Sequence, residues 1–485
     1  MSRGAAILSY AVRPQVTLRL FGRLCLASTP LFAVPALFAL AGGAQGFAWR
    51  MAACAGGAAL AGLALARLRG AKPRLNEVMV VSALAFAGPP VAIAWALTAF
   101  GYDYPSALFE AVSGVTTTGL SVLPREPALP EAVLFTRAWL QWFGGLGFIV
   151  LILGLMGATG AKAARRLGEA GGIAADPVAS LRERARRMLV VYAGLTLLCA
   201  GLLWLTGPDA WEALLFAMTA IATGGFSPDP ASAAALEGLA PRLVLIGFSL
   251  LGAISFSLYL RALRGKGPDD ALRADLIGLA GFLAVSAAGL VAILALQGGL
   301  GAGEVGHGLF IAVSAHTNAG FSTLDEATLP SAALVWLMLA MLIGGNSGCT
   351  AGGVKTFRAL TLVALMRLTL QRPSLPPDAA TRLSVFGRPV GEAELQNAAA
   401  VISLAAATVF LAWLPFLAAG YGLDALFDVV SAVSTTGLSA GAVGPELAPH
   451  LKLTLSLAML LGRVEFIALL IVIWPPTWLG EQMKE

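Results

Sequence analysis

Four short stretches rich in glycine, threonine and serine recur along the chain, and their residue types point to one kind of chemistry. The copies are FEAVSGVTTTGLS from residue 109, FAMTAIATGGFS from 216, FIAVSAHTNAGFS from 310 and FDVVSAVSTTGLS from 427. Each ends in glycine, then Leu or Phe, then Ser. Glycine lets the backbone approach a ligand closely, and rings of backbone carbonyls can replace the water shell of a monovalent cation. The repeated stretch therefore predicts a cation site built from main-chain oxygens.

The candidate ligands in each copy are the glycine and the three residues before it. They are Thr116, Thr117, Thr118 and Gly119; Ala222, Thr223, Gly224 and Gly225; Thr317, Asn318, Ala319 and Gly320; and Ser434, Thr435, Thr436 and Gly437. An internal repeat is a strong indication of architecture, so four copies in register favour a pseudo-fourfold ring around one pore. The alternative for each copy is a re-entrant packing element that binds nothing.

The composition places these stretches in a membrane protein. Of the 485 residues, 58% are hydrophobic and 12% are charged, and the mean hydropathy is +0.81, whereas a soluble domain carries about 25% charged residues. The formal net charge of +5 resides in loops, so we expect no nucleic-acid partner. The cysteines Cys25, Cys54, Cys199 and Cys349 lack metal-like spacing and are expected to be buried thiols.

Apolar runs of spanning length predict an all-α polytopic fold, because a membrane helix needs about 20 apolar residues. Arg19 to Gly42 and Met51 to Leu68 predict two extra N-terminal transmembrane helices. Four units follow, each a span, a pore helix that ends at the repeated glycine, and a second span, which gives about ten spans and four half-spans. The second spans of units two and four are expected over Pro241 to Leu260 and His450 to Trp474. The resulting divisions are residues 1–75 for the extension and 76–160, 161–265, 266–372 and 373–485 for repeats one to four.

The distribution of charge orients the chain. Lys and Arg gather in the loops between units, whereas residues 208–240, 298–330 and 419–449, which carry copies of the motif, contain neither. By the positive-inside rule, the basic loops and both termini are cytoplasmic and every copy enters from the outer face. Acidic residues at that face either raise the local cation concentration or only solvate the loops, and the sequence leaves both interpretations open.

A glycine-rich stretch interrupts the long apolar run of unit three. Its five glycines, each of which costs a helix about 1 kcal/mol relative to alanine, predict a break midway through the span. The stretch comprises Gly344, Gly345, Asn346, Ser347, Gly348, Cys349, Thr350, Ala351, Gly352 and Gly353. A tight helix crossing built from small residues is the alternative.

Two basic residues at membrane depth are further candidates. Arg463 lies inside the apolar run of unit four, where an arginine costs about 2.5 to 3.5 kcal/mol on insertion scales and is functional by default. It either serves the pore or pairs with an acid on another helix, since Glu465 does not share its helix face. Lys355 is either a second pore charge or a positive-inside anchor. Glu110 and Asp428 occupy matching positions in copies one and four, and we expect them to cap the pore helices.

The motifs TTTGLS, ATGGFS, TNAGFS and STTGLS resemble the selectivity filters of the Trk/Ktr/HKT superfamily of potassium transporters. Further segments are similar to that family's inner helices: QWFGGLG at 141–147, GGNSGCTAGGVK at 344–355 and GRVE at 462–465. The resemblance covers essentially the whole chain, and the two extra N-terminal spans indicate the TrkH branch. It implies four pseudo-symmetric span–pore helix–filter–span repeats around one pore, with K⁺ as the only metal, held by the filter.

The resemblance also implies a mechanism and partners. The glycine-rich stretch becomes an intramembrane gating loop beneath the filter, and Arg463 becomes an electrostatic barrier close to it. The chain itself binds no cofactor, and K⁺ is the substrate. Family members form homodimers in the bacterial cytoplasmic (inner) membrane and bind a cytosolic TrkA-type nucleotide-binding regulatory subunit. In plant relatives, serine at the first filter glycine accompanies sodium selectivity, so Gly119 favours potassium.

Three functions compete. A gated K⁺ uptake pore is the first hypothesis. The alternative is a secondary transporter that couples K⁺ to H⁺ or Na⁺ by alternating access, but such folds usually show inverted repeats and ionisable groups at the midplane, whereas all four copies here enter from one face. A membrane enzyme ranks last, because the spans carry no HExxH motif and no Cys–His or Ser–Lys arrangement.

Overall fold

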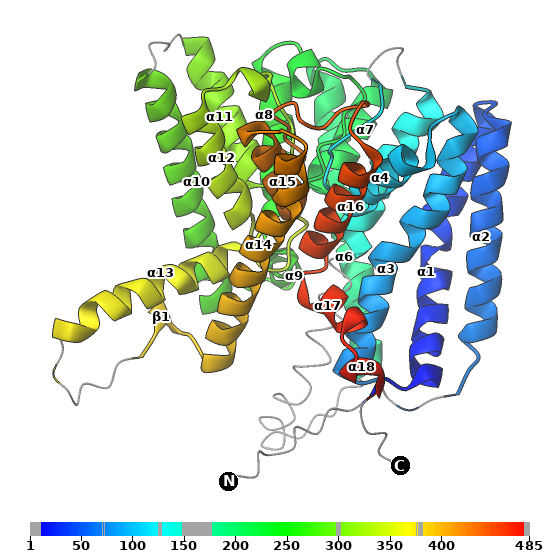
Figure 1. Cartoon of the computed structure of the whole chain (residues 1–485), viewed down its shortest axis with the longest axis horizontal. Helices are drawn as coiled ribbons and strands as arrows, with labels where there is room; N and C mark the ends of the chain where they lie inside the picture. Colours follow the sequence, from blue (N-terminus) through cyan, green and yellow to red (C-terminus); the bar gives the residue numbers. More distant parts are fainter. Residues whose placement is uncertain are drawn as a thin grey trace.

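The computed structural model describes residues 11–69, 71, 73–124, 129–147, 177–296, 302–374, 376 and 382–479 of the 485-residue chain. Within these residues the fold is almost entirely helical (Figure 1). The described strands, β1 (Ser384–Val385) and β2 (Arg388–Pro389), pair antiparallel in one small hairpin. The expected all-α class is therefore confirmed.

The helices are grouped by the extension and the four units that the sequence predicts. The extension and unit one contain α1 (Pro14–Ala41), α2 (Gln45–Leu65), α3 (Leu75–Leu97), η1 (Thr98–Phe100), α4 (Tyr104–Val115) and a helix over 131–147. Unit two contains α6 (Pro177–Thr206), α7 (Ala210–Ile221), η2 (Ser232–Ala235), α8 (Leu239–Ala253) and α9 (Phe256–Ala262). Unit three contains α10 (Asp270–Leu296), α11 (Ala302–His316), η3 (Glu326–Thr328), α12 (Ser331–Ile343), α13 (Thr356–Gln371) and η4 (Arg372–Ser374). Unit four contains α14 (Glu392–Ala418), α15 (Leu423–Ser434), α16 (Pro449–Arg463), α17 (Ile467–Ile473) and α18 (Pro476–Leu479).

Several of these helices are long and apolar enough to cross a membrane. Among the described residues, six meet that criterion, and two bent pairs, α8 with α9 and α16 with α17, meet it together. The chain is thus a multi-pass membrane protein. Two other spans are expected from the sequence. The first is described only over 131–147, and the second is divided into α12 and α13 by the predicted glycine-rich break.

Two spans that the sequence predicts as continuous are broken. The run over Pro241 to Leu260 bends by 88° between α8 and α9, and the run over His450 to Trp474 bends by 115° between α16 and α17. At the second bend, Glu465 and Phe466 are both left-handed, with φ of 54° and 60°. The connecting residues, 254–255 and 464–466, contain neither glycine nor proline, although Gly252 and Gly462 lie in the last turns of α8 and α16. The bends are stabilised by tertiary contacts described below.

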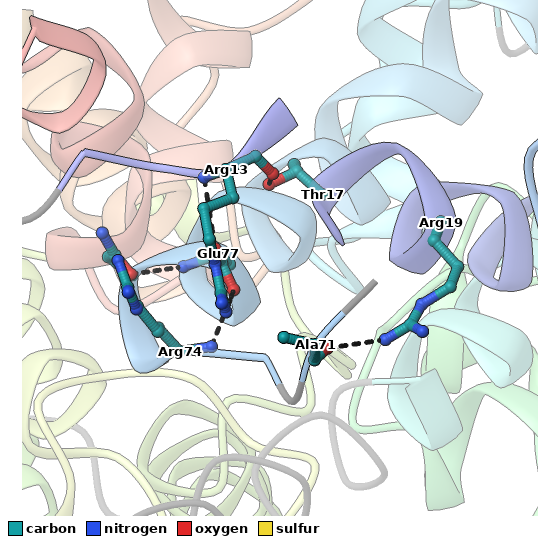
Figure 2. Close-up of polar contacts among 7 residues, drawn as sticks. Arg13, Thr17, Arg19, Ala71, Arg74 and Glu77 are labelled. Carbon is teal, nitrogen blue, oxygen red and sulfur yellow. Dashed lines mark hydrogen bonds and ion pairs between the residues drawn. The ribbon is translucent and has the colours of Figure 1, made fainter. Parts of the chain in front are cut away.

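A buried carboxylate fixes the N-terminal extension to the base of α3 (Figure 2). Arg13 Nε donates to Glu77 Oε1 at 2.7 Å, and the backbone N–H of Arg74 donates to Glu77 Oε2 at 2.7 Å. Next to Arg13, the N–H of Val12 donates to the carbonyl of Thr477 at 2.9 Å. The beginning of the described chain, the start of α3 and the turn α18 are therefore joined at one end of the molecule.

The four short helices α4, α7, α11 and α15 lie in the interior of the fold. The phenylalanine that opens each motif copy packs one of them in place: Phe109, Phe216, Phe310 and Phe427 are all at most 8% exposed. Asp103 caps α4 by accepting from Ser106 N at 3.1 Å, and Asp209 caps α7 by accepting from Glu212 N at 2.8 Å. These helices therefore have defined starts and buried bodies, which fixes where their last residues lie.

Candidate ion-conduction site

Each short helix ends directly at its motif, and the chain then takes the same unusual backbone conformation in all four copies. Two residues before each glycine, the backbone is left-handed, at Thr117, Thr223, Asn318 and Thr435, with φ between 50° and 56°. The glycines Gly119, Gly225, Gly320 and Gly437 also have positive φ, from 73° to 98°. A left-handed residue other than glycine is costly, by about 1–3 kcal/mol, and such residues cluster at functional sites. The same costly backbone conformation recurs in all four motif copies, which indicates that the four segments share one role.

The four glycines lie against one another in a closed cycle. A β-carbon built on Gly119 would come within 3.0 Å of the carbonyl oxygen of Gly224, the residue before the glycine of copy two. The same relation holds for the remaining steps of the cycle: Gly225 with Ala319 O, Gly320 with Thr436 O, and Gly437 with Thr118 O. Each copy thus touches the next, and the fourth touches the first. No side chain fits between them, so the backbones themselves line the ring.

The carboxyl ends of the four short helices face this ring. A helix carries a partial negative charge at that end, and the loops that follow present carbonyl groups at close range. The polar candidates of the ring are buried, with Thr116, Thr117, Thr118, Thr223, Thr317, Asn318, Ser434, Thr435 and Thr436 at most 1% exposed. The hydroxyls of Thr117 and Thr435 are buried without a hydrogen-bond partner among the described residues. An arrangement of this kind suits a monovalent cation that has lost its water.

Glu110 and Asp428 do not cap the short helices, contrary to the expectation from sequence. Each lies beyond the first turn of its helix and holds the segment that follows the ring glycine. Glu110 Oε1 accepts from Ser121 Oγ and from Val122 N, both at 2.7 Å. Asp428 accepts from Ser439 Oγ at 2.8 Å and from Ala440 N at 2.6 Å. The matching positions in the sequence reflect a matching contact, but its target lies after the glycine.

Copies one and four share a second support. The N–H of Gly119 donates to Ser113 Oγ at 3.0 Å, and the N–H of Gly437 donates to Ser431 Oγ at 2.9 Å. Copy two is held differently, by Gln141 on the helix over 131–147. Its Nε2 donates to Gly224 O at 2.5 Å, and its Oε1 accepts from Phe226 N at 3.1 Å. From the sequence, Gln141 was identified only as the start of a helix motif. Its contact with copy two could not be predicted, because the two partners lie in different units.

Asn318 supports copy three. Its Nδ2 donates to Met341 O at 2.9 Å and to Thr436 Oγ1 at 2.7 Å. The second bond joins copies three and four across their boundary. Asn318 therefore replaces the threonine found at this position in the other copies with a side chain that ties two copies together.

The glycine-rich stretch lies directly beneath the ring. Gly353 N donates to Ser434 O at 3.0 Å, and Thr350 Oγ1 donates to Ile221 O at 3.0 Å. A β-carbon on Gly344 would come within 3.0 Å of Asn318 Oδ1. Residues 344–353 therefore touch the filter segments of copies two, three and four, as a loop rather than as a helix crossing.

The same loop stabilises the bend between α8 and α9. Asn346 N donates to Ala253 O at 3.0 Å, and Phe256 N donates to Gly348 O at 3.0 Å. Backbone groups that a continuous helix would have paired internally are thus paired with the loop, which is how a non-helical segment is tolerated at this depth. The break in α8–α9 and the break after α12 depend on each other.

Arg463 connects the loop to unit one. It is 1% exposed, and its Nη1 donates to Thr350 O at 2.6 Å while Nη2 donates to Gly144 O at 3.2 Å. Glu465 lies in the bend after α16, not on the same helix as the sequence predicts, and pairs with Arg358 at 2.6 Å.

Lys355 is 2% exposed, which argues against a surface anchor. Its backbone is left-handed, with φ of 82°, and its Nζ donates to Ala351 O in the loop. The lysine therefore folds back onto the glycine-rich stretch.

Two of the four cysteines are less buried than expected. Cys199 and Cys349 are buried, whereas Cys25 and Cys54 are only partly so. The latter two lie on α1 and α2, where apolar side chains such as Leu37 and Leu60 are also exposed, so an apolar segment there does not imply a buried thiol.

Comparisons with known proteins agree with this geometry. A family model described as a cation transport protein, TrkH, matches residues 94–267 and 296–475. An uncharacterized cation transporter of Methanocaldococcus jannaschii is 30% identical over 83% of this chain and 84% of its own length. The Trk system potassium uptake protein TrkH of Halomonas elongata is 32% identical over 77% of this chain and 79% of its own length.

A solved structure is similar over nearly the whole fold. The crystal structure of the potassium transporter TrkH from Vibrio parahaemolyticus superposes with a TM-score of 0.82 at 27% identity, covering 96% of this chain and 100% of that one. The family match extends over all four motif copies and the loop beneath them. The chain belongs to the TrkH family of cation transport proteins.

Proposed function

We propose that the chain carries K⁺ into the cell through the ring formed by its four filter segments. The observation that carries the proposal is the closed cycle of Gly119, Gly225, Gly320 and Gly437, in which each glycine abuts the carbonyl before the next. Backbone carbonyls suit a dehydrated monovalent cation, and relatives named as potassium uptake proteins support K⁺ as that cation. The family consists of cation transport proteins, so the chain is a transporter and not an enzyme.

The filter is formed by the backbone of residues 116–119, 222–225, 317–320 and 434–437. K⁺ enters from the outer face and exchanges its water for these carbonyls, while the carboxyl ends of α4, α7, α11 and α15 stabilise its charge. Inward movement of one charge gains about 2.3 kcal/mol per 100 mV of membrane potential. The chain requires no cofactor for this step, and K⁺ is the substrate.

The loop over 344–353 is the gate. It lies under three filter copies, and the bonds from Gly353 N to Ser434 O and from Arg463 Nη1 to Thr350 O hold it there. An ion leaving the filter meets this loop and the charge of Arg463, a desolvated cation that repels another cation. Conduction therefore requires the loop and Arg463 to move together. Lys355, bonded to the same loop, adds a second positive charge.

The basic loops face the cytoplasm, both termini are cytoplasmic, and the membrane is the bacterial cytoplasmic membrane. The chain acts as a homodimer with a cytosolic TrkA-type nucleotide-binding subunit. Support for further components comes from relatives named as parts of a Trk system. Such a subunit would contact the basic loops and the segments that follow the gate.

Rb⁺ uptake into proteoliposomes tests the proposal. With an inward-negative potential we expect uptake that K⁺ inhibits strongly and Na⁺ weakly, and that continues without a pH or Na⁺ gradient. Uptake that requires such a gradient would favour the coupled transporter instead. Equal inhibition by Na⁺ and K⁺ would contradict the assigned filter.

A further inference from the structure

Asp275, near the start of α10, is a buried carboxylate that lies outside the ring and its supports. The residue is 4% exposed, and its Oδ2 accepts the backbone N–H of Ser347 at 3.0 Å. Ser347 lies in the middle of the loop over 344–353. The bond thus joins a continuous helix of unit three to the segment beneath the filter.

The broken helix of unit two holds the same loop through main-chain atoms, whereas Arg463 and Lys355 reach it with cationic side chains. Asn346 N donates to Ala253 O at 3.0 Å, and Thr350 N donates to Gly252 O at 3.2 Å. Those carbonyls move only if the broken helix of unit two moves. A carboxylate on a side chain differs, because it rotates about its own χ angles and can leave Ser347 while α10 stays in place.

The charge of Asp275 is placed among basic groups that flank the loop. Burial disfavours a charged carboxylate, and the positive charges of Lys355, Arg388 and Arg358 partly offset this effect on Asp275. Arg388, in the β1–β2 hairpin, lies 4.2 Å from the centroid of the Phe357 ring in α13. The carboxylate is therefore electrostatically linked to the segments that follow the gate as well as bonded to the gate itself.

A cavity borders the residues of α10 that lie next to Asp275 in sequence. Its volume is about 260 Å³, and it is lined by Asp270, Arg273, Ala274, Ile277 and Phe386. Ala274 adjoins Asp275 in sequence, and Arg273 supplies a cation at the cavity wall. Asp275 itself does not line this cavity, so Asp270 at the cavity wall is separate from the bond between Asp275 and Ser347.

We propose that Asp275 is a positioning residue for gating: its carboxylate latches the loop in the closed position at Ser347. The inference rests on the proposed gating role of that loop. Hydrogen bonds to a charged acceptor are roughly twice as strong as neutral ones, so this contact biases the loop toward the closed state. Loss of the carboxylate shifts the loop toward the open state and leaves the filter intact.

The test compares Rb⁺ uptake by the unchanged chain with uptake by Asp275→Ala, Asp275→Asn and Asp270→Ala. Asp275→Ala leaves Ser347 N–H without its acceptor and should raise uptake about tenfold, the factor that corresponds to about 1.4 kcal/mol. Asp275→Asn keeps a neutral acceptor and should give a smaller rise. Asp270 is exposed on the same helix, so Asp270→Ala should leave uptake unchanged. Discrimination between Rb⁺ and Na⁺ should stay constant, whereas a merely structural role would lower uptake or selectivity.

Deletion of residues 345–350 separates the latch from the gate. If the deletion raises uptake and Asp275→Ala then adds nothing to it, both proposals are supported. If the deletion raises uptake but Asp275→Ala alone does not, the latch is overturned and the gate stands. If Asp275→Ala raises uptake by the same factor in the chain that lacks residues 345–350, the effect of Asp275 does not pass through the loop, and the latch is overturned. If the deletion itself fails to raise uptake, the gate is overturned, and the latch with it. If the Asp275→Ala protein cannot be reconstituted, the Asp275→Asn protein is tested in its place. Uptake by Asp275→Asn equal to that of the unchanged chain counts against the latch.

Discussion

At the scale of single residues, the ring glycines are required by space. Each lies where a side chain would collide with the carbonyl of the neighbouring copy, and each has a positive φ that other residues adopt only with strain. Because the carbonyls in question are the proposed ligands, any side chain at these positions changes the size of the ring. In the proposed filter, the glycines would act on selectivity through the space that they leave for these carbonyls.

Gly119→Ser tests this steric role. The added side chain must displace the Gly224 carbonyl, and overpacking of this kind costs about 1–3 kcal/mol. We expect the preference for Rb⁺ over Na⁺ in proteoliposome uptake to fall by about tenfold. Gly247→Ser is the matched control, since Gly247 has open space around it; an unchanged preference in Gly119→Ser would refute the filter assignment.

Asp428→Ala tests the carboxylate clasp behind copy four. The change leaves the N–H groups of Ala440 and Val443 without their acceptor, and an unsatisfied buried donor costs about 1–3 kcal/mol. We expect a lower melting temperature in detergent and a weaker stabilisation of the protein by added K⁺. Glu446→Ala, at an exposed acid in the same connection, should change neither quantity. If Asp428→Ala melts like the unchanged chain, the clasp does not support the ring.

The sequence predicted the ring residues because their chemistry is local. Threonine and glycine at a fixed spacing, repeated four times, need no tertiary information. The supports could not be predicted in the same way. Gln141 reaches copy two from another unit, and Glu110 bonds a segment beyond the glycine, so neither partner is visible from its own surroundings.

At the scale of elements, three helices break within their apolar runs: α8, α12 and α16. The break after α12 was predictable, since five glycines in ten residues cannot continue a helix cheaply. The bends at α8–α9 and α16–α17 were not, because the runs Pro241 to Leu260 and His450 to Trp474 are long and apolar enough overall to predict one continuous span each. Their cause is the loop and the Arg358–Glu465 pair, which only the folded chain brings together.

Glu77→Ala tests how the extension is attached. Glu77 is fully buried and paired with Arg13, and removing one partner of a buried pair costs about 3–5 kcal/mol. We expect a clear fall in melting temperature and increased proteolysis near the start of α1. Glu131→Ala, at an exposed position, serves as control. Unchanged proteolysis in Glu77→Ala would mean that α1 and α2 are held by their packing alone.

Glu326 lies in the turn η3, between α11 and α12 and outside the spanning helices. We expect it to make the stability of the protein depend on pH. Burial raises the pKa of Glu326 to about 7 from an ordinary value of 4.5. The folded state therefore binds this proton more tightly than the unfolded state does. Its contribution to stability is fully present below about pH 4.5 and is lost as the pH rises through about 7, a change of about 3 kcal/mol.

Melting temperatures measured between about pH 4.5 and 8 check this sign. The unchanged chain should lose stability across the interval, and Glu326→Gln, which stays neutral, should lose markedly less. Identical curves for the two proteins would show that Glu326 does not titrate near pH 7.

At the scale of the whole molecule, the four motif copies meet in one closed cycle. Each unit supplies one short helix, one strained turn and one glycine, and the cycle closes only because the fourth glycine meets the first copy. Beneath the cycle, units one, three and four are joined through Arg463 and the loop. The proposed filter therefore draws on all four motif copies, and the contacts of Arg463 beneath it draw on units one, three and four.

The most direct test is to locate the ion. Crystals of the protein grown in Rb⁺ should show anomalous density on the axis of the ring, within coordination distance of carbonyls from residues 116–119, 222–225, 317–320 and 434–437. The density should weaken when K⁺ replaces Rb⁺ in the crystal and should be reduced in Gly119→Ser. Rb⁺ density elsewhere in the molecule, with none inside the ring, would contradict the account.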